Sequence, residues 1–205
     1  MHDERIVWKG SVMTSPLPPA LVTCGDMDKP NILTIAWTGT LCTQPPKTYI
    51  SIRPERYSYG IIEKSREFVI NLPTSKLVRA VDFCGVKSGR DVNKFEAMGL
   101  DICNASAVKA PVLCDSPLSL ECRVTDIVKL GSHDMFLADI IAVSVDPKYI
   151  DKNGRLTLEK AGLIAYSHGD YFALGEKLGD FGFSVRKKKT QTKKSKKKAN
   201  NKHKA

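Results

Sequence analysis

The sequence lacks any continuous apolar segment of the roughly 20 residues that a transmembrane helix needs. Its N-terminus, MHDERIVWKG, contains acidic residues but not the apolar stretch of a secretory signal. We therefore expect no transmembrane segment and a cytoplasmic location. The six cysteines form no CxxC pair, and the four histidines show no metal-ligand spacing. Scattered thiols are typical of a reducing compartment, so we expect reduced cysteines, no disulfide framework and no protein-bound metal.

Acidic residues are absent from the final segment, Arg186–Ala205, which holds 11 of the 32 Lys and Arg residues. Residues 1–185 carry 21 basic and 22 acidic groups, so the formal charge of +10 comes from this tail. The tail has no hydrophobic residue other than alanine and cannot bury enough surface to offset the entropy of ordering. We expect a folded domain over residues 1–185 and a disordered Lys-rich tail over residues 186–205. The tail would either make nonspecific contacts with polyanions such as RNA, DNA or an anionic membrane, or serve only as a solubilising extension.

Short strand-like runs separated by turn-forming segments dominate residues 1–185. ALVTC, ILTIAW, TYISI and EFVINL are rich in β-branched residues, and SLECRVTDIVKL and MFLADIIAVSVD flank GSHD as a long hairpin with a bend near Ile127. Helical patterns cover Arg56–Lys64, a segment from Ser75 as N-cap to Gly85, and SGRDVNKFEAMGL. The Gly- and aromatic-rich segment LIAYSHGDYFALGEKLGDFGFSV is expected to be a loop with a short helix. The pattern predicts a mainly β fold with inserted helices, as an antiparallel barrel or sandwich.

Two segments place basic and hydroxyl side chains at a turn before a helix. In SGRDVNKF, Ser88–Phe95, backbone N–H groups at a glycine turn and the helix dipole would stabilise an anion. An equally good interpretation makes Asp91 the N-cap of a surface helix that buries Val92, Phe95 and Met98. The second segment, SIRPERYSYG, has Arg53 at the end of a strand and Ser58 in the first helical turn. Two such places in a nearly neutral domain favour a phosphate ligand.

An ordered set of motifs resembles the flavin reductase-like family, whose members have an FMN-binding split β-barrel. The motifs are NILTIAWTG, SIRPERYS, EFVINL, CGVKSGRDVNKF, GSHDMF and YFALGEKLGDFGFSV, and they run from about Ala20 to Val185. The resemblance implies a split β-barrel homodimer with FMN near the subunit interface, and the C-terminal aromatics Tyr171 and Phe172 near the partner's flavin.

The resemblance also assigns the FMN-binding residues to two sets. The residues implied at the isoalloxazine and ribityl chain are Asn31, Thr34, Trp37, Thr38, Gly39 and Thr40. Those implied at the phosphate are Arg53, Ser58, Ser88, Gly89, Arg90 and Lys94.

Two aromatic side chains have both a structural and a functional interpretation. Trp37 on a strand fits a core position as well as the apolar wall of a flavin site. His133 lies in a hairpin turn, where an exposed histidine is common. The resemblance implies instead that the histidine of this Gly-x-His turn lies by the flavin and the nicotinamide and is the candidate catalytic residue.

The resulting prediction is an FMN-binding oxidoreductase that takes a hydride from NADH or NADPH. It would pass electrons to a flavin, a metal chelate or a protein acceptor. One alternative is an FMN-containing electron carrier that a protein partner reduces. Another is a nucleic-acid-binding module that acts through the basic tail. The sequence does not specify the electron acceptor.

Overall fold

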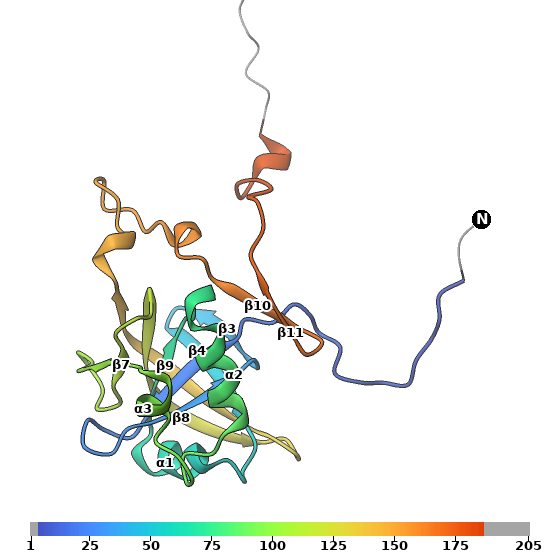
Figure 1. Ribbon diagram of the computed structural model, residues 1–205. Coiled ribbons are helices and arrows are strands. Elements are labelled where there is room, and N and C mark those ends of the chain that lie inside the picture. The colour runs from blue at the N-terminus through green and yellow to red at the C-terminus, as the bar shows by residue number, and fades with distance from the viewer. Residues whose placement is uncertain (1–3, 187–205) are drawn as a thin grey trace, which may run out of the picture. The chain divides into compact units, whose positions relative to one another are not determined.

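The computed structural model describes residues 4–186, and its main element is a seven-stranded antiparallel sheet (Figure 1). The strand order is β2-β1-β5-β8-β9-β4-β3. β2 is at one edge of this order, yet it also contacts β4, next to the opposite edge. The sheet therefore curls toward a barrel. The strands of this sheet are β1 (Ala20–Cys24), β2 (Asn31–Ile35), β3 (Thr38–Thr43), β4 (Pro46–Ile52), β5 (Glu67–Asn71), β8 (Leu118–Lys129) and β9 (Asp134–Val145).

Helices and short strands are inserted between the main strands, as the sequence predicts. α2 and α3 pack against β2 on one face of the sheet, and α1 contacts β1 and β2 (Figure 1). None of the helices within residues 4–186 is long and apolar enough to cross a membrane. The helices are α1 (Tyr57–Ser65), η1 (Ser75–Leu77), α2 (Val78–Val86), α3 (Lys94–Met98), η2 (Pro147–Tyr149), η3 (Leu158–Lys160) and η4 (Phe183–Val185), and the short strands are β6 (Ile102–Cys103), β7 (Val112–Leu113), β10 (Ile164–Ser167) and β11 (Asp170–Ala173).

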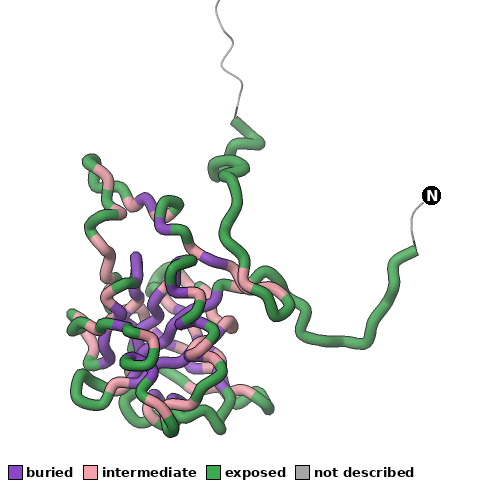
Figure 2. Tube along the Cα trace, in the orientation of Figure 1, coloured by how far each residue is buried: buried purple, intermediate pink, exposed green. Residues whose placement is uncertain are grey.

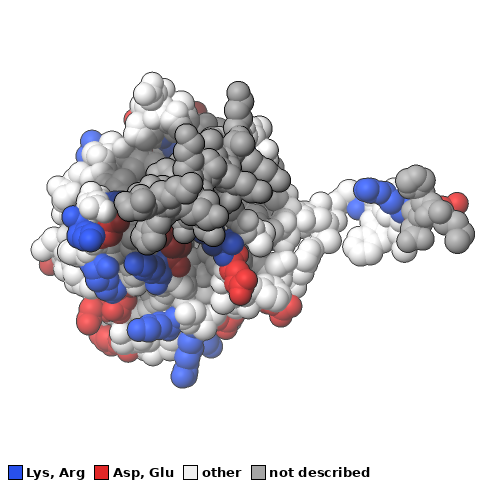
Figure 3. Space-filling model, turned by 90° about the horizontal axis from the view of Figure 1, so that it is seen from above, with Lys and Arg blue, Asp and Glu red and all other residues white. Residues whose placement is uncertain are grey.

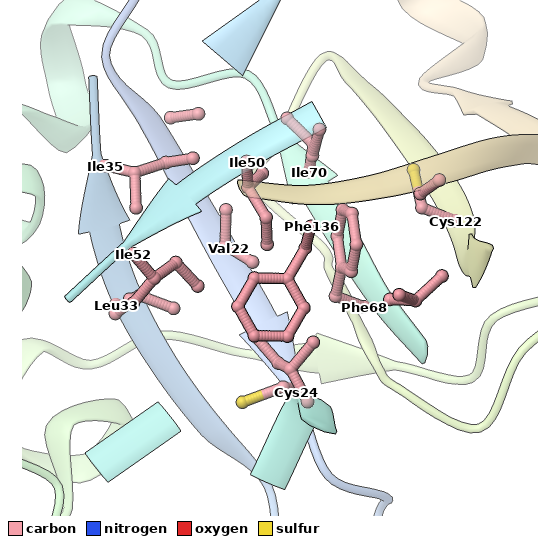
Figure 4. Close-up of a cluster of buried hydrophobic side chains, with 14 of the residues drawn as sticks. Val22, Cys24, Leu33, Ile35, Ile50, Ile52, Phe68, Ile70, Cys122 and Phe136 are labelled. Atoms are coloured by element: carbon pink, nitrogen blue, oxygen red, sulfur yellow. The ribbon is translucent and has the colours of Figure 1, made fainter. Parts of the chain in front are cut away.

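The sheet separates two hydrophobic cores, and every residue of β1 is buried between them (Figure 2). Side chains alternate across a strand. Val22 accordingly points into the barrel core, where Phe68 and Phe136 lie (Figure 4). Leu21 points to the opposite face and packs in the core that α2 and α3 cover. Burial on both faces explains why ALVTC reads as a continuous apolar run.

The predicted long hairpin is confirmed by the antiparallel pairing of β8 with β9, from Leu118↔Val145 to Lys129↔Asp134. The register shifts between Val124 and Asp126, which is the bend expected where the apolar alternation fails.

Two predicted helix starts are wrong. The helix expected from Ser88 begins only at Lys94, and its N-cap is Asn93 rather than Asp91. Asn93 Oδ1 accepts hydrogen bonds from the backbone N–H of Phe95 at 3.1 Å and of Glu96 at 3.4 Å, and Asn93 Nδ2 donates to Glu96 Oε1 at 2.7 Å. This reciprocal cap outcompetes Asp91. Ser75 likewise caps nothing, because it is the first residue of η1, and α2 continues through Gly85 to Val86.

The expectation that all cysteines are reduced is also wrong, because Cys103 and Cys114 form a disulfide. β6 pairs with β7 in an antiparallel hairpin that brings the two Cα atoms to 5.7 Å, within the range a disulfide spans. Two cysteines 11 residues apart form no recognisable motif, so the pair becomes evident only from the β6–β7 hairpin that brings them together. The other four cysteines are free thiols.

The C-terminal segment departs from the expected loop, because β10 and β11 pair as a two-stranded hairpin. The residues between them, His168 and Gly169, have φ values of 50° and 98°, the geometry of a two-residue hairpin turn. A His-Gly pair is a weak turn signal, so the hairpin was missed in the sequence. The expected short helix is present later, as η4.

The chain divides by its internal contacts into one unit of Met1–Leu174 and a second of Gly175–Ala205. The predicted boundary between Val185 and Arg186 falls within the second unit. Of the predicted Lys-rich tail only Arg186 lies among the described residues, so disorder of the tail stays a prediction. Where side chains are visible in Figure 3, basic and acidic residues are interleaved on the surface, in keeping with the near neutrality of residues 1–185.

Candidate functional site

The N-terminus of α1 forms one wall of the candidate site. β4 ends at Ile52, and Arg53 and Pro54 lead into a turn in which Arg56 N donates to Arg53 O at 3.0 Å. Arg56 is the N-cap residue, and its side chain makes no capping hydrogen bond. The free N–H groups of the first turn therefore stay available for an anion. Ser58, which is only 2% exposed, lies in this first turn.

The Ser88–Arg90 turn forms the opposite wall. Arg90 N donates to Ser88 Oγ at 3.2 Å, and the Arg90 guanidinium lies over the Tyr57 ring at 5.6 Å from its centroid. A Cβ atom on Gly89 would lie 2.1 Å from Asn31 Oδ1 and 3.0 Å from Tyr57 Cδ1. Glycine is therefore required here by close approach of the turn to α1 and β2.

These two walls enclose a cavity of about 360 Å³, which we call the basic cavity. It contains all six residues predicted to surround a phosphate, and it has five cationic side chains against one acidic one, Glu55. Glu55 lies 3.5 Å from Arg53 in an exposed ion pair. Burial raises the pKa of the Cys84 thiol to about 11, so this group adds no negative charge at neutral pH. The residues that line the basic cavity are Leu33, Arg53, Glu55, Arg56, Tyr57, Ser58, Cys84, Lys87, Ser88, Gly89, Arg90 and Lys94.

Lys94 is buried, with 4% of its surface exposed, and its ammonium group is partly committed to the fold. Nζ donates to Ile32 O at 2.6 Å and to Cys84 O at 3.1 Å, which ties α3 to β2 and α2. Burial lowers the pKa of Lys94. These two hydrogen bonds use two of the three donors of the ammonium group.

A smaller hollow of about 160 Å³ lies beside the basic cavity and shares Leu33, Arg53 and Arg56 with it. We call it the aromatic hollow because the rings of Trp37 and His133 meet there, with centroids 4.3 Å apart and planes 45° apart. Its walls are Leu33, Thr34, Ile35, Ala36, Trp37, Ser51, Ile52, Arg53, Arg56 and His133.

Trp37 and His133 are both half-buried, so neither the core interpretation of Trp37 nor full exposure of His133 describes them. Burial lowers the pKa of His133, and the nearby Arg53 guanidinium lowers it further. His133 Nδ1 lies 3.0 Å from Ser132 Oγ. At neutral pH the imidazole is therefore mainly uncharged, and its Nδ1 has a hydrogen-bonding partner.

The residues predicted at the flavin ring separate into three groups. Thr34 and Trp37 line the aromatic hollow. Asn31 does not line the basic cavity, but its Nδ2 donates to Oγ of Ser58, which does, at 2.6 Å. The third group, Thr38, Gly39 and Thr40, is on the edge strand β3 and lines neither space.

The β3 residues have interactions of their own with β4. Thr38 Oγ1 donates to Tyr49 O at 2.6 Å, and Thr48 Oγ1 donates to Gly39 O at 2.9 Å. Their contact with a ligand stays a prediction.

Two cationic residues of the basic cavity, Arg56 and Lys87, were missed as site residues. Arg56 Nη1 donates to Gly85 O at 3.0 Å, so it spans the cavity from α1 to α2. Each is close in sequence to a predicted residue: Lys87 directly precedes Ser88, and Arg56 lies two positions before Ser58. A basic residue next to each predicted turn was therefore the sequence signal that could have identified Arg56 and Lys87 as site residues.

The C-terminal aromatics lie in the β10–β11 hairpin. The Tyr171 ring contacts the Tyr166 ring at a centroid distance of 5.3 Å and packs against the core under α2. Phe172 is 51% exposed. Their approach to a partner's flavin site stays a prediction.

Comparison with known proteins gives a match to the model of the flavin reductase like domain over residues 12–175. The chain belongs to the flavin reductase-like family. The structure of flavoredoxin from Desulfovibrio vulgaris superposes on this chain with a TM-score of 0.82 at 28% identity, covering 89% of this chain and 100% of flavoredoxin. The fold is accordingly the split β-barrel that the resemblance implies.

Two relatives are similar to this chain in sequence. An uncharacterised protein from Archaeoglobus fulgidus is 33% identical over 157 residues, which is 77% of this chain and 87% of the relative. An NADPH-flavin oxidoreductase from Streptomyces viridifaciens is 28% identical over 143 residues, which is 68% of this chain and 73% of the relative. The family membership therefore covers the part of the chain that contains both the basic cavity and the aromatic hollow.

Proposed function

We propose that this protein binds FMN and acts as an oxidoreductase that accepts a hydride from NADH or NADPH. The observation that carries the proposal is the adjacency of the basic cavity to the aromatic hollow, with Arg53 and Arg56 in the wall of both. A ligand that fits such a pair of spaces has a phosphate at one end and a flat ring at the other. FMN has this form, and riboflavin lacks the phosphate.

The basic cavity fits a phosphate monoester in charge and in shape. Such a group carries close to two negative charges at neutral pH and accepts hydrogen bonds through three oxygens. The cavity offers the guanidinium groups of Arg53, Arg56 and Arg90, together with the Ser58 and Ser88 hydroxyls. Gly89 leaves the turn open for close backbone approach.

The aromatic hollow fits the ring end of the ligand. Trp37 supplies a flat apolar surface, and Ile35 and Ile52 extend it. When bound, FMN would supply the capacity to accept a hydride and to release electrons. His133, kept mainly neutral by burial and by Arg53, can hold or donate a proton at an imidazole nitrogen beside the ring.

The likeness to flavoredoxin favours a second candidate, an FMN-containing electron carrier that a protein reductase supplies. The NADPH-flavin oxidoreductase, at the same identity of 28%, supports direct use of a pyridine nucleotide. Both candidates use the same cofactor and the same cavity. They differ in whether NADH or NADPH alone can reduce the bound flavin.

The experiment is an anaerobic titration of the FMN-loaded protein with NADH and, separately, with NADPH. We expect loss of the visible flavin absorbance with at least one of them, and tighter binding of FMN than of riboflavin beforehand. Reduction only after addition of a protein reductase would favour the electron carrier. Failure to bind FMN would overturn both candidates.

A further inference from the structure

A hydrogen-bonded cluster of Tyr59, Lys129 and Asp134 lies at the base of the turn that carries His133, because Lys129 and Asp134 flank that turn. Tyr59 Oη donates to Asp134 Oδ2 at 2.7 Å. Lys129 Nζ donates to the same Asp134 oxygen at 2.7 Å and to Tyr59 Oη at 2.7 Å. Each group therefore contacts both others, and the three polar groups fix one geometry.

Two of the three side chains are buried, so breaking their hydrogen bonds would cost free energy. Asp134 is 3% exposed and Tyr59 is 7% exposed. The hydrogen bond from Lys129, followed by that from Tyr59, lowers the pKa of the Asp134 carboxyl, so Asp134 is ionised at neutral pH. A buried carboxylate that loses a donor is left with an unmet hydrogen bond. The Asp134 carboxylate therefore depends on both donors, Tyr59 and Lys129, and loss of either should be costly.

The cluster clamps the two ends of the β8–β9 hairpin. Lys129 is the last residue of β8, Asp134 is the first residue of β9, and the two are directly paired. Only Leu130, Gly131, Ser132 and His133 lie between them, and Leu130 N donates to His133 O at 3.2 Å. Fixing both ends of so short a turn restricts the backbone of His133, whose ring contacts the Trp37 ring.

The cluster also connects this turn to the basic cavity through α1. Tyr59 directly follows Ser58, which lines the cavity. The Tyr59 ring packs edge-on against Phe136 of β9 at a centroid distance of 5.1 Å. One turn of helix therefore presents a hydroxyl to the cavity and a hydroxyl to the His133 hairpin.

We propose that Tyr59, Lys129 and Asp134 are positioning residues that hold His133 beside the aromatic hollow and in register with the phosphate-binding end of α1. This inference rests on the proposed function, because His133 acts there beside the bound flavin. None of the three residues lines the aromatic hollow, so they act through the turn and not by contact with its occupant.

The test is Tyr59→Phe, which keeps the ring packed on Phe136 and removes the hydroxyl. We expect FMN affinity within about two-fold of the wild type, because the basic cavity is unchanged. The kcat for reduction by the pyridine nucleotide should fall about 10-fold with little change in KM, since a misplaced catalytic group lowers turnover and not binding. Tyr149→Phe, in η2 and outside both cavities, is the matched control and should leave kcat unchanged.

A second measurement is the NMR titration of the His133 imidazole in the protein without added nucleotide, with its signal identified by loss in His133→Gln. The charges that affect His133 are Arg53, Glu55, Arg56 and Asp134, and Tyr59→Phe keeps them all. If the turn loosens, His133 becomes less buried, and its pKa should rise toward the ordinary value. Unchanged kcat together with an unchanged His133 pKa would overturn the inference.

If Tyr59→Phe fails to fold, Lys129→Met tests the same cluster from an exposed side chain, 67% accessible. Lys129→Arg, which keeps the donors, should restore the wild-type His133 titration. Equal titrations for Lys129→Met and wild type would contradict the inference. Failure of the wild type to bind FMN would instead overturn the proposed function, while the titration would still decide the role of the cluster.

Discussion

The basic cavity and the aromatic hollow share a wall but are built in different ways. The basic cavity is made by two turns, Arg53–Ser58 and Ser88–Arg90, which bring charges and backbone donors together. The aromatic hollow is made by the ends of strands β2 and β4, by the β2–β3 connection that carries Trp37, and by one hairpin turn, and its only histidine is His133. The first can supply binding energy for a charged end group, and the second can supply a surface and a proton. If FMN binds as proposed, affinity and reactivity would depend on different ends of the site, with Arg53 and Arg56 contributing to both.

The largest expected effect on FMN affinity comes from a substitution in the wall that the two spaces share. Arg53 faces both spaces, and Arg53→Glu replaces an attractive charge with a repulsive one beside the phosphate. A hydrogen bond to a charged group contributes about 1.5–3 kcal/mol, so reversal should weaken FMN by about 100-fold or more. Riboflavin should lose less than about three-fold, because it lacks the phosphate. Equilibrium dialysis or fluorescence quenching with both ligands measures the difference.

The control for this prediction is Lys152→Glu, which makes the same charge change at an exposed turn away from both cavities. It should leave both affinities unchanged. Equal losses of FMN and riboflavin in Arg53→Glu would mean that the cavity does not hold the phosphate.

A smaller effect is expected from a change confined to the basic cavity, Gly89→Ala. The new Cβ would lie 2.1 Å from Asn31 Oδ1, so Asn31 must shift, and Asn31 holds Ser58 through a hydrogen bond of 2.6 Å. Overpacking of this kind costs about 1–3 kcal/mol, and we expect FMN to bind about 10-fold more weakly. Thermal unfolding and FMN titration measure the two consequences.

Gly60→Ala is the matched control, because a Cβ on Gly60 meets no atom within 4 Å. Gly60 lies inside α1, where alanine is favoured over glycine by up to about 1 kcal/mol. Its unfolding temperature should hold or rise, with FMN affinity unchanged. Wild-type FMN affinity in Gly89→Ala would show that the Ser88–Arg90 turn does not contact the ligand.

The basic cavity was predictable because its signals are local. Arg53 follows a strand at a proline, Ser58 lies in the next helical turn, and Gly89 follows a serine at a turn. Each of these features depends on a few neighbouring residues, so the sequence pattern carries them. The fold class was predictable for the same reason, from short β-branched runs between turns.

Features that depend on strand register or on distant pairs were not predictable from pattern. The contact of Thr38–Thr40 with a flavin stays a prediction, and only the register of β3 with β4 shows that the Thr38 hydroxyl donates to Tyr49 O. The Tyr59–Lys129–Asp134 cluster joins residues 70 positions apart in sequence, and no local signal marks it. The disulfide depends in the same way on the hairpin that returns Cys114 to Cys103.

The smallest expected effect on both spaces comes from removing the basic tail. Every residue of the basic cavity and of the aromatic hollow lies before Leu100 except His133, and all lie within the unit that ends at Leu174. A truncation after Val185 should therefore leave FMN occupancy and the rate of flavin reduction nearly unchanged.

Polyanion binding should respond differently to the truncation. The segment Arg186–Ala205 carries 11 Lys and Arg residues, which would neutralise phosphates and release the counterions condensed on RNA. For full-length protein we expect RNA affinity to fall steeply with salt and to depend little on base sequence, and for the truncated protein we expect it to be lost. The two proteins are compared by FMN absorbance, by NADPH and NADH oxidation, and by RNA binding at low and high salt. Loss of flavin on truncation would place the tail in the cofactor site, and undiminished RNA binding would require a polyanion surface on the nearly neutral residues 1–185.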